Sequence, residues 1–218
     1  MKYISGALLL ITVSLSTYAQ YNKFELGVQG GPNVSFLRFQ KTPGIKNSPL
    51  FAFTGGLFFQ YNVTKTFSLR VDPGLERKGY CDQFPFGPPN DQNEKDRESF
   101  NYLTVPVLLR AAVGNKIRYF VNAGPYVAFL LSEKDRETPP NEATLVYTST
   151  SYYQTTDWGV TTGLGLSIPV HEKVSISVEV RNNLGLTNIN KNSGEYGTIK
   201  TNTTNVLFGL AYKFGSKK

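Results

Sequence analysis

The two residue types that most often carry out catalysis, histidine and cysteine, each occur once in this chain, as His171 and Cys81. A nucleophilic cysteine needs a histidine as its base, and a metal-binding histidine needs further ligands. His171 lies in residues 169–173, which we interpret as a tight turn, and Cys81 opens a polar segment predicted at the other end of the fold. The sequence offers no serine, histidine and acid in a triad arrangement. It therefore predicts a protein that is not an enzyme.

Two further patterns have the composition of ligand sites. Residues 85–100 are rich in acids and amides, and Asp91, Asn93 and Asp96 carry oxygens of the kind calcium prefers. Their spacing is not that of an EF-hand, and basic residues lie among them, so we interpret the segment as a solvated loop. Residues 163–167, GLGLS, are not followed by a helix, as a phosphate-binding loop requires. Glycines there are expected to relieve crowding inside a narrow barrel, and no metal ion or cofactor is predicted.

The elements that position these residues show strict alternation of apolar and polar side chains. In residues 174–181, VSISVEVR, apolar Val178 and Val180 alternate with charged Glu179 and Arg181. Such a period of two predicts a β-strand with one apolar and one polar face. Comparable segments predict eight strands, at residues 24–37, 51–62, 66–80, 99–113, 116–131, 152–168, 174–186 and 202–214.

The connections between these strands alternate between short and long. Short turns are predicted at residues 63–65, 114–115 and 169–173, and long polar loops at about 38–50, 81–98, 132–151 and 187–201. In an up-and-down barrel this order places every long loop at one end and every short turn, with both termini, at the other. Bacterial outer-membrane barrels have that asymmetry. A lipocalin-like soluble barrel also has eight strands, but it has less reason to sort its loops.

The polar faces of the predicted strands carry balanced charge. Acids and bases of similar number fit a closed lumen, where buried charges must be paired. An eight-stranded barrel is just wide enough for side chains to fill it. The predicted lumen charge network consists of Glu25, Arg70, Asp72, Glu76, Arg110, Arg118, Asp157, Glu179, Arg181 and Lys213.

Aromatic residues on the apolar faces fall near the strand ends. Girdles of aromatic side chains at both ends are typical of lipid interfaces, so the apolar faces are predicted to meet lipid. The predicted interface aromatics are Tyr61, Phe67, Tyr119, Tyr212 and Phe214 at the short-turn end, and Trp158 at the long-loop end.

The N-terminus predicts that the protein is secreted, and the charge distribution bears on its partners. Residues 1–19 combine a lysine, an apolar run over about residues 7–15 and the small residues Thr17 and Ala19, which predicts a secretory signal peptide cleaved after Ala19. Residues 20–218 then form the barrel domain. Basic residues are dispersed along the chain and form no block, so no nucleic-acid partner is expected.

Several segments resemble the PorT-like outer-membrane β-barrel family of Bacteroidetes-type bacteria. The resemblance covers essentially the whole chain after residue 19. It rests on the order of LGVQGGPNVSF, FTGGLFFQYNVTKTFSLRVDPGLERKG, NYLTVPVLLR, FVNAGPYVAFLL and DWGVTTGLGL. The resemblance implies an eight-stranded outer-membrane barrel and implies no particular activity, because a shared fold does not fix function.

The sequence thus predicts an all-β protein, an eight-stranded antiparallel up-and-down transmembrane barrel in a Gram-negative outer membrane. Its termini are expected in the periplasm and its long loops outside the cell. We expect a non-enzymatic anchoring or loop-binding role, with outer-membrane lipid as one partner and envelope proteins or extracellular glycans as partners of the loops. The alternatives are a narrow pore for small solutes and a secreted soluble calyx that binds a lipophilic ligand.

Overall fold

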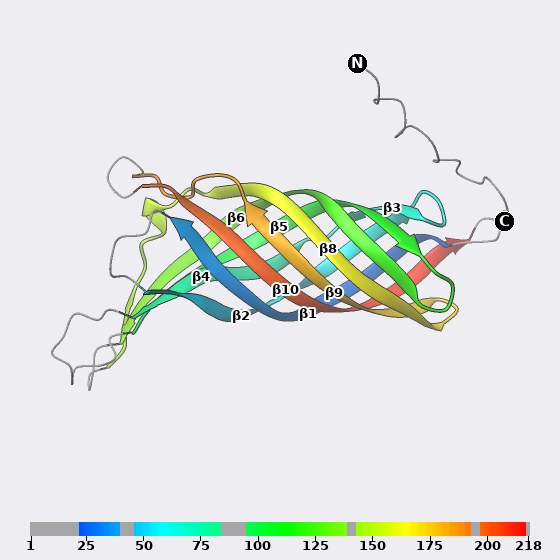
Figure 1. Ribbon diagram of the computed structural model, residues 1–218, viewed down its shortest axis with the longest axis horizontal. Helices are drawn as coiled ribbons and strands as arrows, with labels where there is room; N and C mark the ends of the chain where they lie inside the picture. The colour runs from blue at the N-terminus through cyan, green and yellow to red at the C-terminus, as the bar shows by residue number, and fades with distance from the viewer. Residues whose placement is uncertain (1–21, 40–45, 84–94, 139–142, 193–196, 217–218) are drawn as a thin grey trace, which may run out of the picture.

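The computed structural model describes residues 22–39, 46–83, 95–138, 143–192 and 197–216 of the chain. Nearly all of these residues lie in strands (Figure 1). The elements in chain order are β1 (Asn22–Phe39), β2 (Lys46–Asn62), β3 (Phe67–Val71), β4 (Gly74–Gln83), β5 (Lys95–Val113), β6 (Arg118–Thr138), β7 (Leu145–Tyr147), the 3₁₀ turn η1 (Thr150–Tyr152), β8 (Thr156–His171), β9 (Val174–Gly185) and β10 (Ile199–Ser216).

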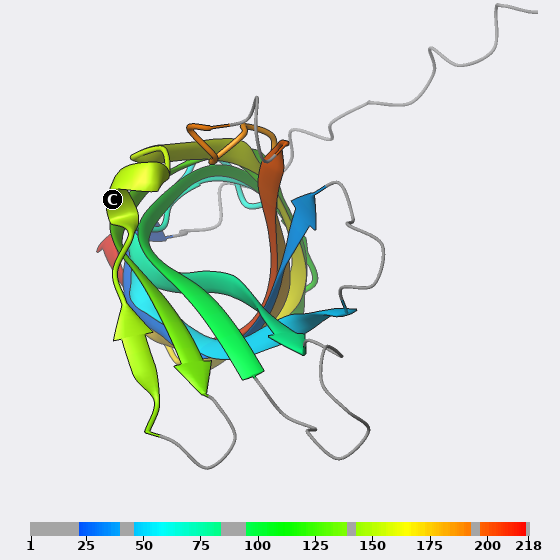
Figure 2. The ribbon, with the colours of Figure 1, turned by 90° about the vertical axis from the view of Figure 1, so that its left-hand side faces the viewer.

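The strands form one antiparallel sheet that closes on itself. Each of β1, β2, β5, β6, β8, β9 and β10 pairs with neighbours on both sides, and the pairing of β1 with β10 joins the two ends of the chain. β3 and β4 together fill the remaining place between β2 and β5. The barrel therefore has eight positions around its wall, as predicted, and is hollow in backbone outline when viewed along its axis (Figure 2).

The division between β3 and β4 falls at Asp72 and Pro73, where proline has no backbone N–H to give to the sheet. The wall stays continuous through the carbonyl of Pro73, which accepts the N–H of Leu57 at 2.9 Å. On the other side, the N–H of Asp72 donates to the carbonyl of Pro106 at 3.1 Å. The break is thus a local irregularity in one wall position and does not open the barrel.

Side-chain alternation turns the apolar faces outward. On β9, Val178 and Val180 are 38% and 45% exposed, whereas Glu179 and Arg181 are each 3% exposed. The same inversion holds around the wall, where outward-facing Leu, Val, Ile, Phe and Tyr side chains are exposed and inward-facing polar side chains are buried. This pattern is the one a lipid-facing barrel requires.

The strands extend well past their predicted ends at the long-loop side. β6 has 21 residues, about twice the 9–11 residues that a tilted strand needs to cross a bilayer. β5 begins at Lys95 and β10 at Ile199, inside segments predicted as loops. The predicted loops 38–50, 81–98, 132–151 and 187–201 were therefore too long, because hydrogen bonding between neighbouring strands continues beyond the apolar belt that marked the strands in the sequence.

Turn geometry at the other end also differs in detail from the prediction. The turn predicted over 169–173 contains only Glu172 and Lys173, because β8 runs to His171 with a register shift next to Pro169. At the turn between β5 and β6, Gly114 has a φ of +107°, a conformation that side chains other than glycine rarely adopt. Figure 1 shows these short turns gathered at one end of the barrel.

Among the described residues, no helix is both long and apolar enough to cross a membrane. The predicted signal peptide, residues 1–19, lies outside the described residues. It stays a prediction.

Candidate functional site

The lumen holds most of the predicted charge network. Of the predicted network, Glu25, Arg70, Asp72, Glu76, Arg110, Asp157, Glu179 and Arg181 are all buried on the inner face. Arg118 and Lys213 are only half-buried, because they lie at the open rim of the short-turn end. The predicted set therefore occupies two different environments.

The middle of the lumen is occupied by a chain of ion pairs. Arg70 Nε lies 2.6 Å from Asp72 Oδ1, and the other oxygen of Asp72 accepts Arg181 Nη2 at 2.7 Å. Arg181 Nε in turn pairs with Glu179 Oε1 at 2.7 Å. Arg70 also donates to Gln29 Oε1 at 2.6 Å. These contacts join β1, β3 and β9 across the barrel, so the central charges neutralise one another in pairs.

A second cluster surrounds a lysine that the sequence analysis did not single out. Lys78 on β4 has 0% exposure and lies 2.9 Å from Asp157 Oδ2. The same oxygen accepts Tyr126 Oη at 3.0 Å and Thr201 Oγ1 at 2.7 Å. The alternation of the strand could have identified Lys78. It lies two residues after Glu76, which was predicted to face inward, and residues two apart in a strand point to the same face.

Glu76 extends the second cluster across the lumen. Its Oε2 accepts Thr104 Oγ1 at 3.0 Å and lies 3.7 Å from Lys78 Nζ. Its Oε1 accepts the side-chain amides of Asn183 at 2.8 Å and Asn205 at 2.9 Å. Strands from opposite walls are thereby connected through one carboxylate. We define the lumen network as Gln29, Arg70, Asp72, Glu76, Lys78, Asp157, Glu179, Arg181, Asn183, Thr201 and Asn205.

Packing around this network leaves little free volume. A cavity beside Asp72 and Arg181 measures about 30 Å³, room for about one water molecule. The glycines of the GLGLS segment face inward, and a methyl group on Gly165 would lie 2.6 Å from the ring of Phe120. Gly163 is equally crowded, at 2.5 Å from Glu179 Oε1. The inner wall is thus filled by large side chains that require glycine opposite them.

At the long-loop end the lumen contents change from polar to apolar. A cluster of buried hydrophobic side chains closes this end, with Tyr80, Tyr153 and Ile199 packed against it. We call it the capping cluster; its buried members are Leu37, Phe100, Tyr102, Tyr126, Ala128, Leu130 and Ile189. Ile189 comes from the connection between β9 and β10 and has 0% exposure. A loop residue therefore fills the end of the barrel.

Backbone hydrogen bonds hold Ile189 in place. Its N–H donates to the carbonyl of Ile199 at 2.9 Å, and its carbonyl accepts the N–H of Gln154 at 2.7 Å. Asn188 Oδ1 accepts the N–H of Ile199 at 2.8 Å. Gln154 belongs to the long connection between β6 and β8. The two loops are therefore joined by hydrogen bonds across the long-loop end of the barrel.

Tyr153 packs against the capping cluster and joins it to β5. Its ring meets Phe100 edge-on, with centroids 4.7 Å apart and planes at 84°. Its hydroxyl donates to a carboxylate oxygen of Glu98. Glu98 lies on β5 beyond the lipid-facing part of the strand, and burial raises the pKa of its carboxyl group to about 7. A titratable contact thus secures the cap.

The predicted interface aromatics all point outward. Tyr119, Trp158 and Tyr212 are each more than half exposed. Tyr61, Phe67 and Phe214 are partly covered by neighbours, and Phe24 joins this short-turn group by stacking on Phe214 at 5.6 Å. Sequence reasoning missed Phe24, although it has the parity of the outward-facing residues of β1. Their role at the lipid interface stays a prediction.

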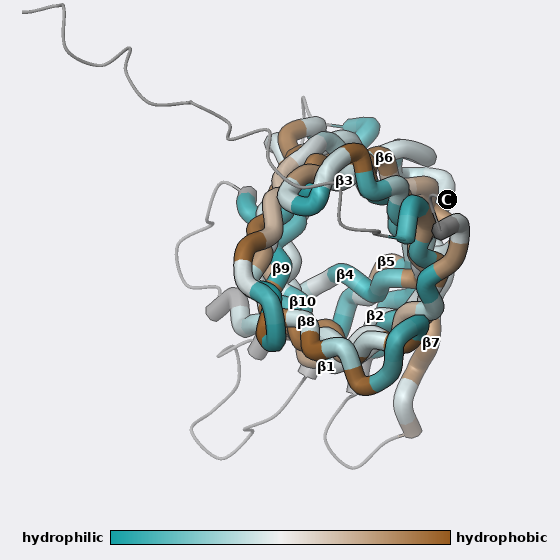
Figure 3. The backbone as a smooth tube through the Cα atoms, turned by 90° about the vertical axis from the view of Figure 1, so that its right-hand side faces the viewer, coloured by the Kyte–Doolittle hydropathy of each residue, from teal (hydrophilic) through white to brown (hydrophobic). Residues whose placement is uncertain are grey.

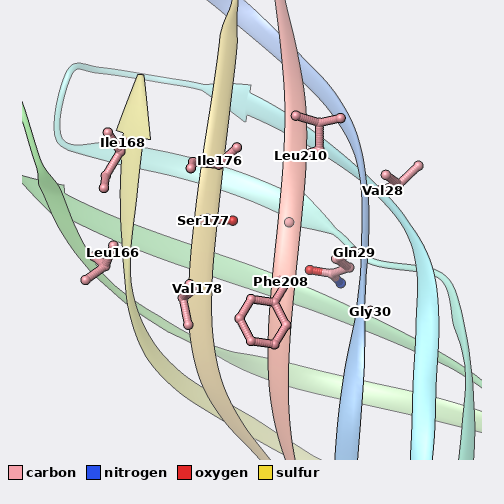
Figure 4. Close-up of a pocket in the computed structure, with 11 residues that line it drawn as sticks. Val28, Gln29, Gly30, Leu166, Ile168, Ile176, Ser177, Val178, Phe208 and Leu210 are labelled. Atoms are coloured by element: carbon pink, nitrogen blue, oxygen red, sulfur yellow. The ribbon is translucent and has the colours of Figure 1, made fainter. Parts of the chain in front are cut away.

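The outer wall also contains a shallow apolar groove of about 470 Å³. It crosses β8, β9, β10 and β1, and Figure 4 shows Ile176, Leu210 and Val28 around it. Its apolar side chains are those that alternate to the outer face. It is therefore part of the surface that meets lipid.

The single histidine and the single cysteine lie far apart. His171 is the exposed last residue of β8 at the short-turn end, whereas Cys81 lies on β4 near the long-loop end and pairs in register with Ser48. Within the described residues, no group of histidine, cysteine and acidic side chains could hold a metal ion. The side chains of Asp91, Asn93 and Asp96 lie outside the described part.

Comparisons with known proteins agree with this geometry. Residues 18–191 match the family described as outer membrane protein beta-barrel domain. Among solved structures, Neisserial surface protein A matches with a TM-score of 0.52 at 12% identity, over 90% of this chain and 99% of that chain. OprG of Pseudomonas aeruginosa matches with a TM-score of 0.47 at 14% identity, over 89% and 98% of the two chains. No curated protein matches.

Proposed function

The chain belongs to the outer membrane protein beta-barrel domain family, and from this premise we propose that it is a closed, non-conducting, non-enzymatic barrel. In this proposal the barrel anchors a rigid loop platform in the outer membrane. Within the family, the resemblance of NYLTVPVLLR and FVNAGPYVAFLL supports a place among PorT-like barrels.

One observation carries the proposal: polar side chains fill the middle of the lumen and apolar ones close its long-loop end. Opening a passage would require separating Lys78 from Asp157 and withdrawing Ile189 from the capping cluster. Unpairing buried charges and exposing apolar surface both cost free energy. The outward apolar faces also oppose the soluble-calyx alternative, which needs them inside.

The platform offers exposed apolar side chains for binding. Leu145, Val146 and Tyr147 on β7 and Tyr152 on η1 are each between 44% and 59% exposed. They lie at the long-loop end, beyond the lipid-facing belt, where solvent-exposed apolar groups are typical of contact surfaces. We propose that this surface contacts an envelope protein or an extracellular glycan.

Conductance is the direct test. Purified protein that migrates faster on a gel without boiling is folded, and the same sample is added to planar lipid bilayers. We expect no steady single-channel current from the folded protein. A regular current that the variant Ile189→Asp does not change would overturn the closed-barrel proposal in favour of the narrow pore.

Orientation is tested by cysteine labelling in intact cells. In a Cys81→Ser background, Tyr152→Cys places a thiol on the platform and Lys65→Cys places one in a short turn; both positions are exposed. A membrane-impermeant maleimide should label Cys at position 152 in intact cells and at position 65 only after lysis. The reverse pattern would contradict the proposal of extracellular loops and periplasmic termini.

A further inference from the structure

The short-turn end of the barrel, in contrast to the capped end, is hollowed. A cavity of about 320 Å³ opens at this mouth, and its charged lining residues are Glu25, Lys65, Arg118, Glu172 and Lys213. These residues come from strand ends and turns around the whole rim, which Figure 3 views from outside. The volume falls in the range that small-molecule sites occupy.

Below the rim, a second cavity of about 20 Å³ leads inward. It shares Glu25, Arg118 and Lys213 with the mouth and reaches Arg110 and Gln60. The two cavities together are lined by four basic and two acidic side chains, the bases being Lys65, Arg110, Arg118 and Lys213. One of the acids, Glu25, already accepts the side-chain amide of Asn62 at 3.0 Å.

Two of these bases, Arg118 and Lys213, are not neutralised by the described residues as the lumen network is. Among the ion pairs of the described residues, none includes Arg118 or Lys213. Arg118 donates one hydrogen bond, to the carbonyl of Lys65 at 2.5 Å. The guanidinium group of Arg118 and the ammonium group of Lys213 therefore line the cavity with N–H donors that can bind a ligand.

Arg110 supplies a second, independent observation. Its side chain is 7% exposed, and its Nη2 has no hydrogen-bond partner among the described residues, although it lies 3.5 Å from Glu179 Oε2. A charge-assisted hydrogen bond is about 2.7–2.9 Å long, so that contact is only a long ion pair. Gln60 Oε1, which lines the same small cavity, also lacks a partner within the described part of the chain. Buried donors and acceptors left unpaired cost free energy.

We propose that the short-turn mouth is a binding site for a phosphate-type oxyanion, held by Arg118 and Lys213 and supported electrostatically by Arg110 beneath them. Guanidinium groups match the geometry of phosphate oxygens, and a lysine adds a mobile charge. Glu25 and Glu172 at the rim can accept hydrogen bonds from hydroxyl groups, which favours a phosphate ester over a bare ion. The phosphate can belong to a free small molecule or to a lipid headgroup.

Titration with inorganic phosphate tests the site. The full barrel domain, folded in a non-ionic detergent, is titrated calorimetrically with phosphate at constant ionic strength. The double variant Arg118→Gln with Lys213→Gln should raise the Kd about tenfold or more, since it removes two charge-assisted donors. The matched control is Lys134→Gln with Arg136→Gln, which removes the same charge from exposed positions on β6 at the other end.

Binding that survives the mouth variant, or that both double variants weaken equally, overturns the proposal, as does the absence of binding by the parent protein. Nanodiscs separate the two sources of phosphate. If phosphatidylglycerol nanodiscs raise the apparent Kd for phosphate relative to the non-ionic detergent, and the rise persists at an ionic strength that screens the bilayer charge, a lipid headgroup competes for the site. An unchanged Kd assigns the site to free phosphate. The result is independent of conductance and loop binding, so it can fail while the closed barrel stands.

Discussion

The two ends of this barrel differ: the long-loop end is closed by apolar packing, and the short-turn end is open and charged. At the long-loop end, Ile189 inserts among aromatic and aliphatic side chains, and this apolar packing closes the end of the lumen. At the short-turn end, Arg118 and Lys213 line an open cavity. Between them, paired charges such as Lys78 with Asp157 fill the lumen. Apolar packing therefore closes the end where loops are long enough to fold back, and charges remain where turns are too short to cover them.

The largest expected effect comes from breaking a buried charge pair between the two ends. Lys78→Met leaves Asp157 charged and buried, and should lower the free energy of unfolding by about 3–5 kcal/mol. Urea unfolding in lipid vesicles, followed by fluorescence of the single tryptophan, Trp158, measures this loss. Combining Lys78→Met with Asp157→Asn removes both charges and should recover most of it. No recovery would mean that the lysine acts through packing and not through its charge.

Truncating the residue that seals the long-loop end should have a large but local effect. Ile189→Ala removes buried methyl groups and should weaken loop docking by about 2–5 kcal/mol, without changing the unfolding midpoint of the barrel. Amide exchange at Gln154, whose N–H is bonded to Ile189, should accelerate by about thirtyfold or more. Leu186→Ala, at an exposed position of the same connection, is the control. Equal acceleration in both variants would contradict a specific role for Ile189.

The burial of Glu98 beneath Tyr153 makes the closed end sensitive to pH. Burial raises the pKa of Glu98 from the ordinary 4.5 to about 7, so docking favours the neutral carboxyl group. Its contribution is fully present below about pH 4.5 and is lost as the pH rises through about 7. The exchange protection factor of Gln154 should therefore fall severalfold between pH 5 and pH 8. In Glu98→Gln the protection should not change over this range; a matching fall would rule out titration of Glu98 as the cause.

The smallest expected effect is at the open end. Lys213→Gln should change the free energy of unfolding by no more than about 0.5 kcal/mol, because the ammonium group is half-buried and belongs to no ion pair among the described residues. The same urea titration checks this value. A loss comparable to that of Lys78→Met would show that Lys213 stabilises the fold as the buried lumen network does. The short-turn end would then not differ from the lumen in this respect.

Much of the fold could be predicted because a strand exposes its two faces with a period of two. Val178 and Glu179 differ in polarity and must therefore lie on opposite faces, whatever the partner strands are. The same rule placed Arg70 and Asp72 inward and applied equally to Lys78. The long-loop boundaries could not be predicted in this way, since β5 and β6 continue beyond the membrane with polar residues on both faces.

The sequence by itself determined the closed antiparallel barrel, the inversion of its apolar faces and most of the charges directed inward, because these follow from alternation and from the order of short and long connections. Only the tertiary structure decided which charges pair, since Asp72 meets Arg181 across 109 residues of chain. It also decided that Ile189, an isolated apolar residue in a polar connection, seals one end, while Arg118 and Lys213 at the other end form no ion pair with any described residue. Such contacts depend on distances across the lumen, which no local pattern encodes.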